Sequence, residues 1–310
     1  MSAIPFVTLD APRYGEAIAV SPLVRRVIAD NPSKYTYFGT GTYIIGHEDV
    51  AVVDPGPLLD SHRDALAAAL NGARVRAILV THCHSDHSPL AAWLGDETGA
   101  PTFAFGPHGT AESDSEDSEV DAEIEEGVTL GETIDMEFVP DVRVGDGEVA
   151  AMGDGWTMRG VHTPGHTSNH MCYALDEESA LFTGDHVMGW STTVVSPPDG
   201  DMRAYIDSLR KVIARDDATL WPTHGAPVTS PRPFLQAYLR HRLEREAQVL
   251  EAVRSGTSDI ASMVKVMYAG VREELHKAAG RSVLSHLIKL VDDGAVTVDG
   301  TGKSAKYFPH

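Results

Sequence analysis

Histidine and aspartate residues are concentrated in one short stretch of the chain, His82-Cys83-His84-Ser85-Asp86-His87. Three imidazoles and a carboxylate within this stretch cannot all enter an apolar core without a large desolvation cost. In a loop at the end of a strand, however, they can face one point in space. Neutral imidazole nitrogens and carboxylate oxygens are ligands for Zn²⁺, and also for Mn²⁺ and Fe²⁺. The stretch therefore predicts a metal site rather than a His-rich surface loop.

Three more candidate ligands, His166, Asp185 and His224, each follow a short strand-like apolar run. Side chains at the carboxyl ends of neighbouring strands converge on the crevice where α/β proteins place their sites. Together with the residues of the first stretch they give seven ligands, which divide into three, three and one shared carboxylate. Such a set is enough for two metal ions about 3.5–4 Å apart.

The elements that must position these residues alternate between strands and helices, which is typical of an α/β chain. A short continuous apolar run over 77–80, before the first cluster, is typical of a strand that is buried on both faces. We expect further strands over 43–46, 50–54, 157–161, 171–174, 180–183 and 219–221, and helices over 61–70 and from 89 to 94.

The pattern changes after residue 230. Apolar residues spaced by three and four predict a long helix over 234–254. A second helix ending near Tyr268, more helix within 271–290 and a terminal hairpin over 295–308 should follow it. Three helices followed by a hairpin is the layout of a winged helix. We therefore divide the chain into residues 1–230 and residues 231–310.

Charge and composition exclude several classes of protein. The chain has 310 residues, with 25 Lys and Arg against 45 Asp and Glu, for a net charge of −20. No stretch approaches the ~20 consecutive apolar residues of a membrane span, and the N-terminus lacks a basic, apolar signal. The two cysteines are too few for a disulfide framework. We expect a cytoplasmic protein with no membrane partner.

The negative charge is local rather than general. Residues 112–148 contain 15 acids and one base, a balance of −14, whereas residues 231–310 contain 12 bases and 9 acids, a balance of +3. The acidic segment 110–127 is predicted to be a solvated or disordered loop. Nucleic acids bind through Lys and Arg, so the charge weakens a nucleic-acid function without excluding it.

The order H-x-H-x-D-H, P-G-H, G-D and T-H-G resembles the metallo-β-lactamase superfamily, and the spacing fits it as well. The resemblance covers nearly the whole chain, with the acidic segment as the main departure. It implies a four-layer αβ/βα sandwich. The C-terminal part looks like the branch with an appended winged helix, which includes lactamase-like endoribonucleases. The segments that carry the rest of the resemblance are 39–46, 53–57 and 283–287.

The resemblance also implies a role for each ligand. A first metal ion would be bound by His82, His84 and His166, a second by Asp86, His87 and His224, and Asp185 would bridge them. The expected cofactor is a pair of zinc ions, with manganese or iron as alternatives, holding a bridging hydroxide. Asp86 is also the candidate catalytic residue that orients this nucleophile. The Cys ligand of the classical zinc lactamases is not matched beside Asp185, which weighs against antibiotic hydrolysis.

Other residues carry a weaker signal. His170 is either a substrate or supporting residue, or a buried histidine at the start of a strand. Trp190, Thr192 and Thr193 lie in a loop that could wall the pocket, although Trp190 could equally be core. Asp54 is expected in a turn or behind the ligands, and His62 is expected at the surface.

Three functions fit this pattern. The first is a dinuclear metal-dependent hydrolase of a small ester, thioester, lactone or lactam. The second is a metal-dependent endoribonuclease or phosphodiesterase that acts on single-stranded RNA. The third is a regulator whose winged helix binds DNA while the metal domain senses a ligand. We favour the first, with a small-molecule substrate, and a homodimer is possible.

Overall fold

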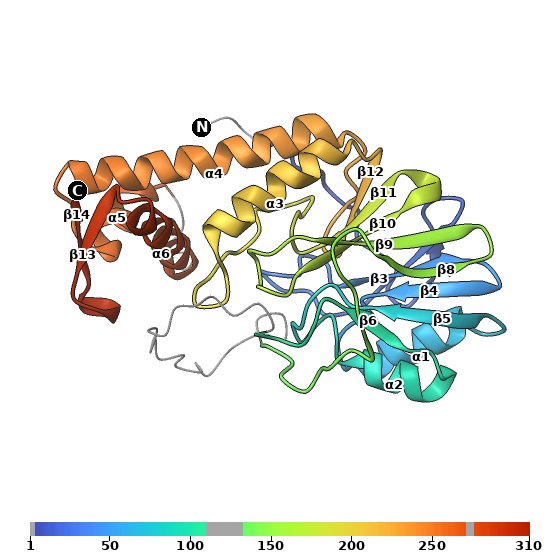
Figure 1. Ribbon diagram of the computed structural model, residues 1–310. Helices are drawn as coiled ribbons and strands as arrows, with labels where there is room; N and C mark the ends of the chain where they lie inside the picture. The colour runs from blue at the N-terminus through green and yellow to red at the C-terminus, as the bar shows by residue number, and fades with distance from the viewer. Residues whose placement is uncertain (1–3, 110–132, 271–275) are drawn as a thin grey trace.

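The computed structural model describes residues 4–109, 133–270 and 276–310, and the acidic segment 110–127 lies outside them. The described strands form a seven-stranded sheet, a five-stranded sheet and a hairpin (Figure 1). The first sheet consists of β1 (Ile18–Ala19), β2 (Val24–Ile28), β3 (Gly41–Gly46), β4 (Asp49–Val53), β5 (Arg74–Leu79), β6 (Thr102–Ala104) and β7 (Val142–Arg143), in that order. The second sheet has the order β12 (Thr219–Pro222), β11 (Ala180–Gly184), β10 (Met171–Leu175), β9 (Trp156–His162) and β8 (Val149–Gly153).

The two sheets pack face to face between two layers of helices. Side chains of β3, β4 and β5 meet those of β9, β10 and β11 in one core between the sheets. A second core joins the first sheet to α1 (Asp60–Ala69) and α2 (Leu90–Thr98). A third joins the second sheet to α3 (Met202–Arg215) and the first half of α4 (Pro231–Arg254). The predicted four-layer αβ/βα sandwich is confirmed.

Both faces of the central strands are buried, which explains their apolar runs. In β10, Met171 and Tyr173 enter the core between the sheets, while Cys172 and Ala174 enter the core beneath α3. Successive side chains of a strand point to opposite faces, so a strand covered on both sides needs apolar residues at every position.

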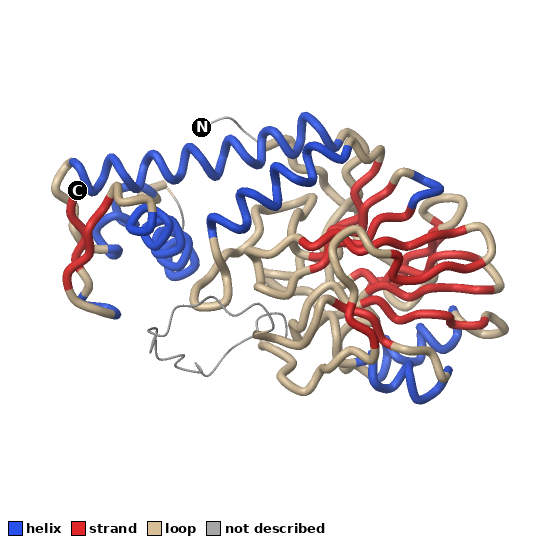
Figure 2. The backbone as a smooth tube through the Cα atoms, viewed as in Figure 1, coloured by secondary structure: helices blue, strands red, loops and turns tan. Residues whose placement is uncertain are grey.

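The strands that precede the candidate ligands end on the same side of the sandwich. β4, β5 and β6 pair in parallel, as do β11 and β12. Figure 2 shows long loops gathered at this side of the strands, between the sheets and the C-terminal helices. The topology therefore brings together residues that lie far apart in the sequence.

The sequence analysis missed the helix α3. Its signals are present, because Asp201 caps it by accepting a 2.6 Å hydrogen bond from the Ala204 N–H. Its buried residues Tyr205, Leu209 and Val212 also recur at intervals of three and four. Strands β1, β2, β6, β7 and β8 were missed as well.

The C-terminal residues form a separate small core. It joins the end of α4 to α5 (Ile260–Met267), α6 (His276–Asp292), β13 (Val296–Asp299) and β14 (Lys306–Pro309). Helix α6 runs without a break through Gly280, within the region 271–290 where the sequence predicts more helix. Single 3₁₀ turns occur at Asp176–Glu178 and Gly302–Ser304.

Helix α4 contributes to two cores. Phe234 and Tyr238 in its first half pack beneath the second sheet, whereas Val249 and Val253 pack among the C-terminal elements. Figure 1 shows α4 running beside α3 and onward to α5, α6 and the hairpin. The division at residue 230 stays a proposal, and α4 packs both beneath the second sheet and among the C-terminal elements. Within the described residues, no helix has the length and hydropathy needed to cross a bilayer.

Candidate metal centre

The cluster His82–His87 begins three residues after the end of β5, where the sequence analysis expects it. His82, Asp86 and His87 are buried, and His84 is half-buried. The structure brings all seven candidate ligands together in two adjoining groups.

The first group consists of three histidines and one aspartate, His82, His84, His166 and Asp185. His84 Nδ1 lies 2.9 Å from His82 Nε2 and 3.2 Å from His166 Nε2. The second group consists of Asp86, His87 and His224. Asp86 Oδ2 lies 3.4 Å from His87 Nε2 and 3.2 Å from His224 Nε2.

Asp185 faces both groups. Its Oδ2 lies 3.8 Å from His166 Nε2 in the first group. Its Oδ1 lies 3.7 Å from His87 Nε2 and 3.4 Å from His224 Nε2 in the second. A single carboxylate thus presents one oxygen to each group, which is the arrangement that a bridging ligand requires.

The donor set fits divalent metal ions. Three of its buried atoms, Asp86 Oδ1, His87 Nε2 and Asp185 Oδ1, have no hydrogen-bond partner. Buried polar atoms are normally paired, and unpaired ones in a native structure often mark a functional site or an ion. Burial lowers the pKa of His82 and the pKa of His84 well below the usual value for histidine. Both rings are therefore neutral, which is the form that coordinates metals.

The electrostatics of the second group favour positive charge. Burial alone would lower the pKa of His87, but the carboxylates of Asp86, Asp54 and Asp185 raise it to about 10. Burial opposes ionisation of Asp86 too, yet His87 and His224 lower its pKa. The carboxylates therefore stabilise a cation here, and a divalent ion satisfies the same requirement.

The ring nitrogens that face away from the centre are held by neighbouring groups. Such partners fix the orientation and tautomer of ligating histidines. The four hydrogen-bonded pairs are His82 Nδ1 with Thr81 Oγ1 (3.0 Å), His87 Nδ1 with Asp54 Oδ2 (2.8 Å), His166 Nδ1 with Val194 O (2.6 Å) and His224 Nδ1 with Gly39 O (3.2 Å).

Asp54 lies behind the ligands, which is one of the two positions expected for it, and connects three segments of the chain. It is fully buried, and its Oδ1 accepts a 2.8 Å hydrogen bond from the Thr81 N–H. Its Oδ2 accepts from Thr81 Oγ1 at 2.9 Å and Thr223 Oγ1 at 3.0 Å, besides His87. The residue adopts a left-handed backbone, with φ of 49°, which Asp tolerates better than most residues.

Residues 36–224, more than half of the chain, match the family model described as the metallo-beta-lactamase superfamily. The chain belongs to this superfamily. Residues 260–304 match the model described as the beta-lactamase associated winged helix domain, which confirms the branch that the sequence indicates.

The relatives agree with this assignment. The chain is 30% identical over 302 residues to an atrochrysone carboxyl ACP thioesterase of Aspergillus chevalieri, covering 93% of this chain and 87% of that protein. It is 29% identical to the lactamase-like protein notP of Aspergillus sp. (strain MF297-2), over 96% of this chain and 89% of that protein. The chain is a hydrolase of the metallo-β-lactamase fold, as the sequence predicts.

Solved structures show the same fold. A beta-lactamase domain protein from Burkholderia ambifaria has a TM-score of 0.77 and 22% identity, covering 96% of this chain and 95% of that one. A metallo-beta-lactamase family protein from Thermus thermophilus has a TM-score of 0.74 and 22% identity, covering 94% of this chain and 100% of that one. Both likenesses extend over the sandwich and the C-terminal elements.

In this metallo-β-lactamase fold, His170 lies behind the ligands, fully buried. Its Nε2 accepts a 3.2 Å hydrogen bond from the Asp185 N–H, and its Nδ1 lies 2.9 Å from Thr163 Oγ1. Gly184 makes this approach possible, because a Cβ there would lie 2.7 Å from His170 Nε2. His170 thus contacts the main chain of Asp185 from behind the ligands.

Trp190 and Thr192 occupy the loop after Asp185, and both are half-buried. The Trp190 ring stacks on Tyr37 with centroids 4.9 Å apart. It is neither wholly buried nor fully exposed, and its position at a pocket wall stays a prediction. Thr193, named with them for the pocket wall, is instead buried, and its hydroxyl donates to the main-chain carbonyls of Asp185 and His186.

Two further residues differ from expectation or were missed. His62, expected at the surface, is buried, and its Nε2 lies 2.9 Å from Thr42 Oγ1. Burial lowers the pKa of His62 to about 4. Thr40 was not singled out, although its hydroxyl donates a 2.9 Å hydrogen bond to Asp86 Oδ2. The sequence could have predicted the burial of His62 but not the contact of Thr40. His62 lies four positions before the apolar Leu66, on the face of α1 that is buried.

The cysteines do not take part in the chemistry of the site. Cys83 lies between ligands but packs in the core beneath α1 and α2, and burial raises its pKa to about 11. Burial raises the pKa of Cys172 to about 12. Neither is available as a thiolate nucleophile at neutral pH.

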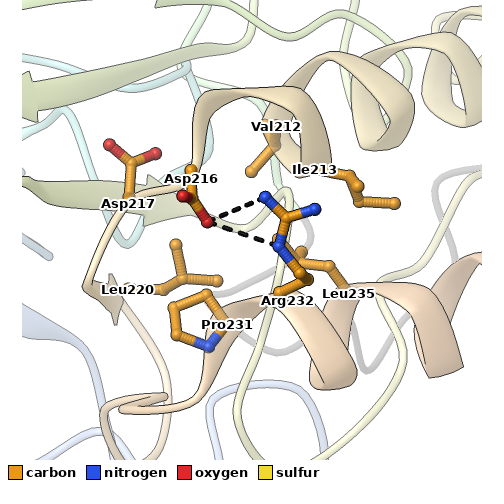
Figure 3. A pocket seen from close by; sticks show the side chains of 8 residues that line it. All are labelled: Val212, Ile213, Asp216, Asp217, Leu220, Pro231, Arg232 and Leu235. Atoms are coloured by element: carbon orange, nitrogen blue, oxygen red, sulfur yellow. Dashed lines mark hydrogen bonds and ion pairs between the residues drawn. The ribbon is translucent and has the colours of Figure 1, made fainter.

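A small cavity between the end of α3 and the start of α4 is a separate feature (Figure 3). Its volume is about 10 Å³, room for about one water molecule. Arg232, one of the residues that line it, donates a 2.9 Å hydrogen bond to Asp216. The cavity lies at the start of β12, whereas His224 follows the end of that strand, so it is not part of the metal site.

Proposed function

We propose that the chain is a metal-dependent hydrolase of acyl thioesters or chemically related acyl compounds. Its two metal ions would be held by the seven residues described above. The observation that carries the proposal is the position of Asp185 between the two ligand groups, with one oxygen toward each. Zinc suits this imidazole and carboxylate set best, and manganese and iron are the alternatives.

The first ion would be held by His82, His84 and His166 and the second by Asp86, His87 and His224, with Asp185 shared. When bound, two such ions polarise an acyl oxygen and lower the pKa of a coordinated water. Thr40 fixes the Asp86 carboxylate by donating to Oδ2, which leaves Oδ1 without a partner. Oδ1 is thereby placed to accept a hydrogen bond from the attacking water and to orient it.

A thioester is favoured among the acyl substrates. The relative from Aspergillus chevalieri that is 30% identical over nearly the whole chain carries the name of an ACP thioesterase. A thioester presents the same reacting group as an ester, lactone or lactam, an acyl carbon that water attacks. The proposal therefore keeps those three classes as less favoured substrates.

The test combines metal counting with a substrate panel. Elemental analysis of the purified chain should find two metal ions, and an acyl-pantetheine thioester should be cleaved with release of its thiol. Asp86→Asn should reduce kcat by about 10²-fold or more, because it removes the negative carboxylate that would both bind the second metal ion and orient the water. Asp207→Asn on the exposed side of α3 is the matched control and should leave the rate unchanged. Thioester cleavage that persists after metal removal would refute the proposal.

The same panel separates the alternatives. Single-stranded RNA, duplex DNA, nitrocefin and a lactone are tested with the same variants. RNA cleavage that Asp86→Asn abolishes, with no thioester turnover, would support an endoribonuclease instead. Binding of duplex DNA without turnover of any substrate would support a regulator. The cytoplasmic location and the homodimer stay predictions.

A further inference from the structure

The loop Ser191–Val194 touches two of the proposed metal ligands. The carbonyl of Val194 accepts a 2.6 Å hydrogen bond from His166 Nδ1. The hydroxyl of Thr193 donates to the main-chain carbonyls of Asp185 at 2.8 Å and His186 at 3.0 Å. The position of this loop therefore sets the orientation of the His166 ring and the main chain at Asp185.

Helix α4 holds the loop in place through two buried side chains. Tyr238 donates a 2.7 Å hydrogen bond to the Ser191 carbonyl and accepts one of 2.8 Å from the Thr193 N–H. Arg242 donates through Nη2 to the Thr193 carbonyl. The two residues are four positions apart, so they lie on one face of the helix.

Arg242 is costly to bury and therefore informative. Its residue exposure is 3%, and its guanidinium lies over the ring of Tyr205, 5.1 Å from the centroid. The Tyr205 hydroxyl in turn donates a 2.7 Å hydrogen bond to the His186 carbonyl. Burying a charge is unfavourable unless hydrogen bonds compensate for it. The hydrogen bond to the Thr193 carbonyl therefore offsets part of the cost of burying the charge of Arg242.

We propose that Tyr238 and Arg242 are positioning residues for the metal centre. Through Ser191–Val194 they fix the hydrogen bond to His166 Nδ1 and so hold His166 Nε2 toward His84 and Asp185. Neither residue touches a ligand directly. The proposal rests on the metal site proposed above and extends it to α4, outside the segment that carries the seven ligands.

The test measures zinc affinity of the full-length chain by competition with a chromogenic chelator after metal removal. Tyr238→Phe and Arg242→Met should each raise the apparent zinc dissociation constant by about 10-fold or more, because supporting partners of metal ligands typically contribute about 10–100-fold. Arg242→Lys, which keeps a donor and the charge, should recover part of this loss. Arg240→Met, at an exposed position of the same helix, should bind zinc like the unmodified chain.

Two further readouts distinguish positioning from a purely structural role. The visible spectrum of the Co²⁺-substituted protein should change in Tyr238→Phe, and zinc should raise Tm by less than in the unmodified chain. An equal loss of Tm with and without zinc, together with an unaltered cobalt spectrum and zinc affinity, would overturn the inference. If Arg242→Met does not fold, Tyr238→Phe decides, because it removes a single hydroxyl. Failure of the unmodified chain to bind zinc, manganese or iron would instead refute the proposed function.

Discussion

The side chains of His87 and Asp54 share a 2.8 Å hydrogen bond between Nδ1 and Oδ2, and neither is exposed to solvent. The bond leaves His87 Nε2 as the atom that faces Asp86, Asp185 and the metal site. Because the same carboxylate also holds Thr81 and Thr223, one residue aligns the segments that follow β5 and β12.

Replacing Asp54 should therefore weaken metal binding without altering a ligand. In Asp54→Asn the neutral amide is a weaker acceptor for His87 and cannot satisfy all the donors that the carboxylate now serves. We expect zinc affinity to fall by about 10–100-fold, measured by chelator competition. Asp64→Asn, an exposed carboxylate on α1, is the control. Unchanged zinc affinity in Asp54→Asn would show that Asp54 serves only the fold.

Stability should fall in mild acid because of His62. Its pKa is about 4 in the folded chain, lowered by burial from 6.5, so the unfolded chain binds more protons between these values. The free energy of unfolding should drop by about 2 kcal/mol between pH 7 and pH 5 from this residue alone. Urea denaturation of the metal-free chain at both pH values measures this drop. His62→Gln should show a smaller drop, and an equal one would contradict the assignment.

Gly184 should not tolerate a side chain. Its φ is 50°, and a Cβ there would lie 2.7 Å from His170 Nε2 and 2.8 Å from Thr81 Oγ1. We expect Gly184→Ala to lower the free energy of unfolding by about 1–3 kcal/mol and to weaken zinc binding by displacing Asp185. Gly95→Ala within α2 is the counterpart, since its Cβ would meet only ordinary contacts from 3.5 Å. It should be neutral or stabilising by up to about 1 kcal/mol.

Both cysteines should be unreactive in the folded chain. Their pKa values of about 11 and about 12 keep them protonated at pH 8, and both are buried. We expect Ellman's reagent to label neither thiol in the native chain and both in urea. Rapid labelling of native Cys83 would show that the segment between His82 and His84 opens. Rapid labelling would also add a background signal to thioester assays that detect free thiol.

The seven proposed ligands could be selected from the sequence because each one follows a strand-like run and belongs to a recognisable motif. Their supporting residues could not. Thr40 contacts Asp86 across 46 positions, and Tyr238 contacts Thr193, in the loop after Asp185, across 45 positions. Threonine and tyrosine are common in every kind of segment, so only the folded chain shows which of them face the site.

The errors in the secondary structure have a similar origin. α3 has both a cap and an apolar pattern, yet the sequence analysis assigned no element to this segment. His62 was assigned to the surface because it has no motif, whereas the deciding fact is that α1 turns this residue toward Thr42. Whether a polar residue on a helix is buried or exposed depends on which face of the helix packs against the rest of the fold.

The double role of α4 determines how the molecule can be divided. At 1.5 Å per residue its 24 residues span about 36 Å. One end of this rod completes the core beneath the second sheet, and the other carries the C-terminal unit. A chain cut at residue 230 would lose Phe234 and Tyr238, and with them part of that core. Engineering that removes or exchanges the winged helix should therefore join the new sequence beyond Arg242.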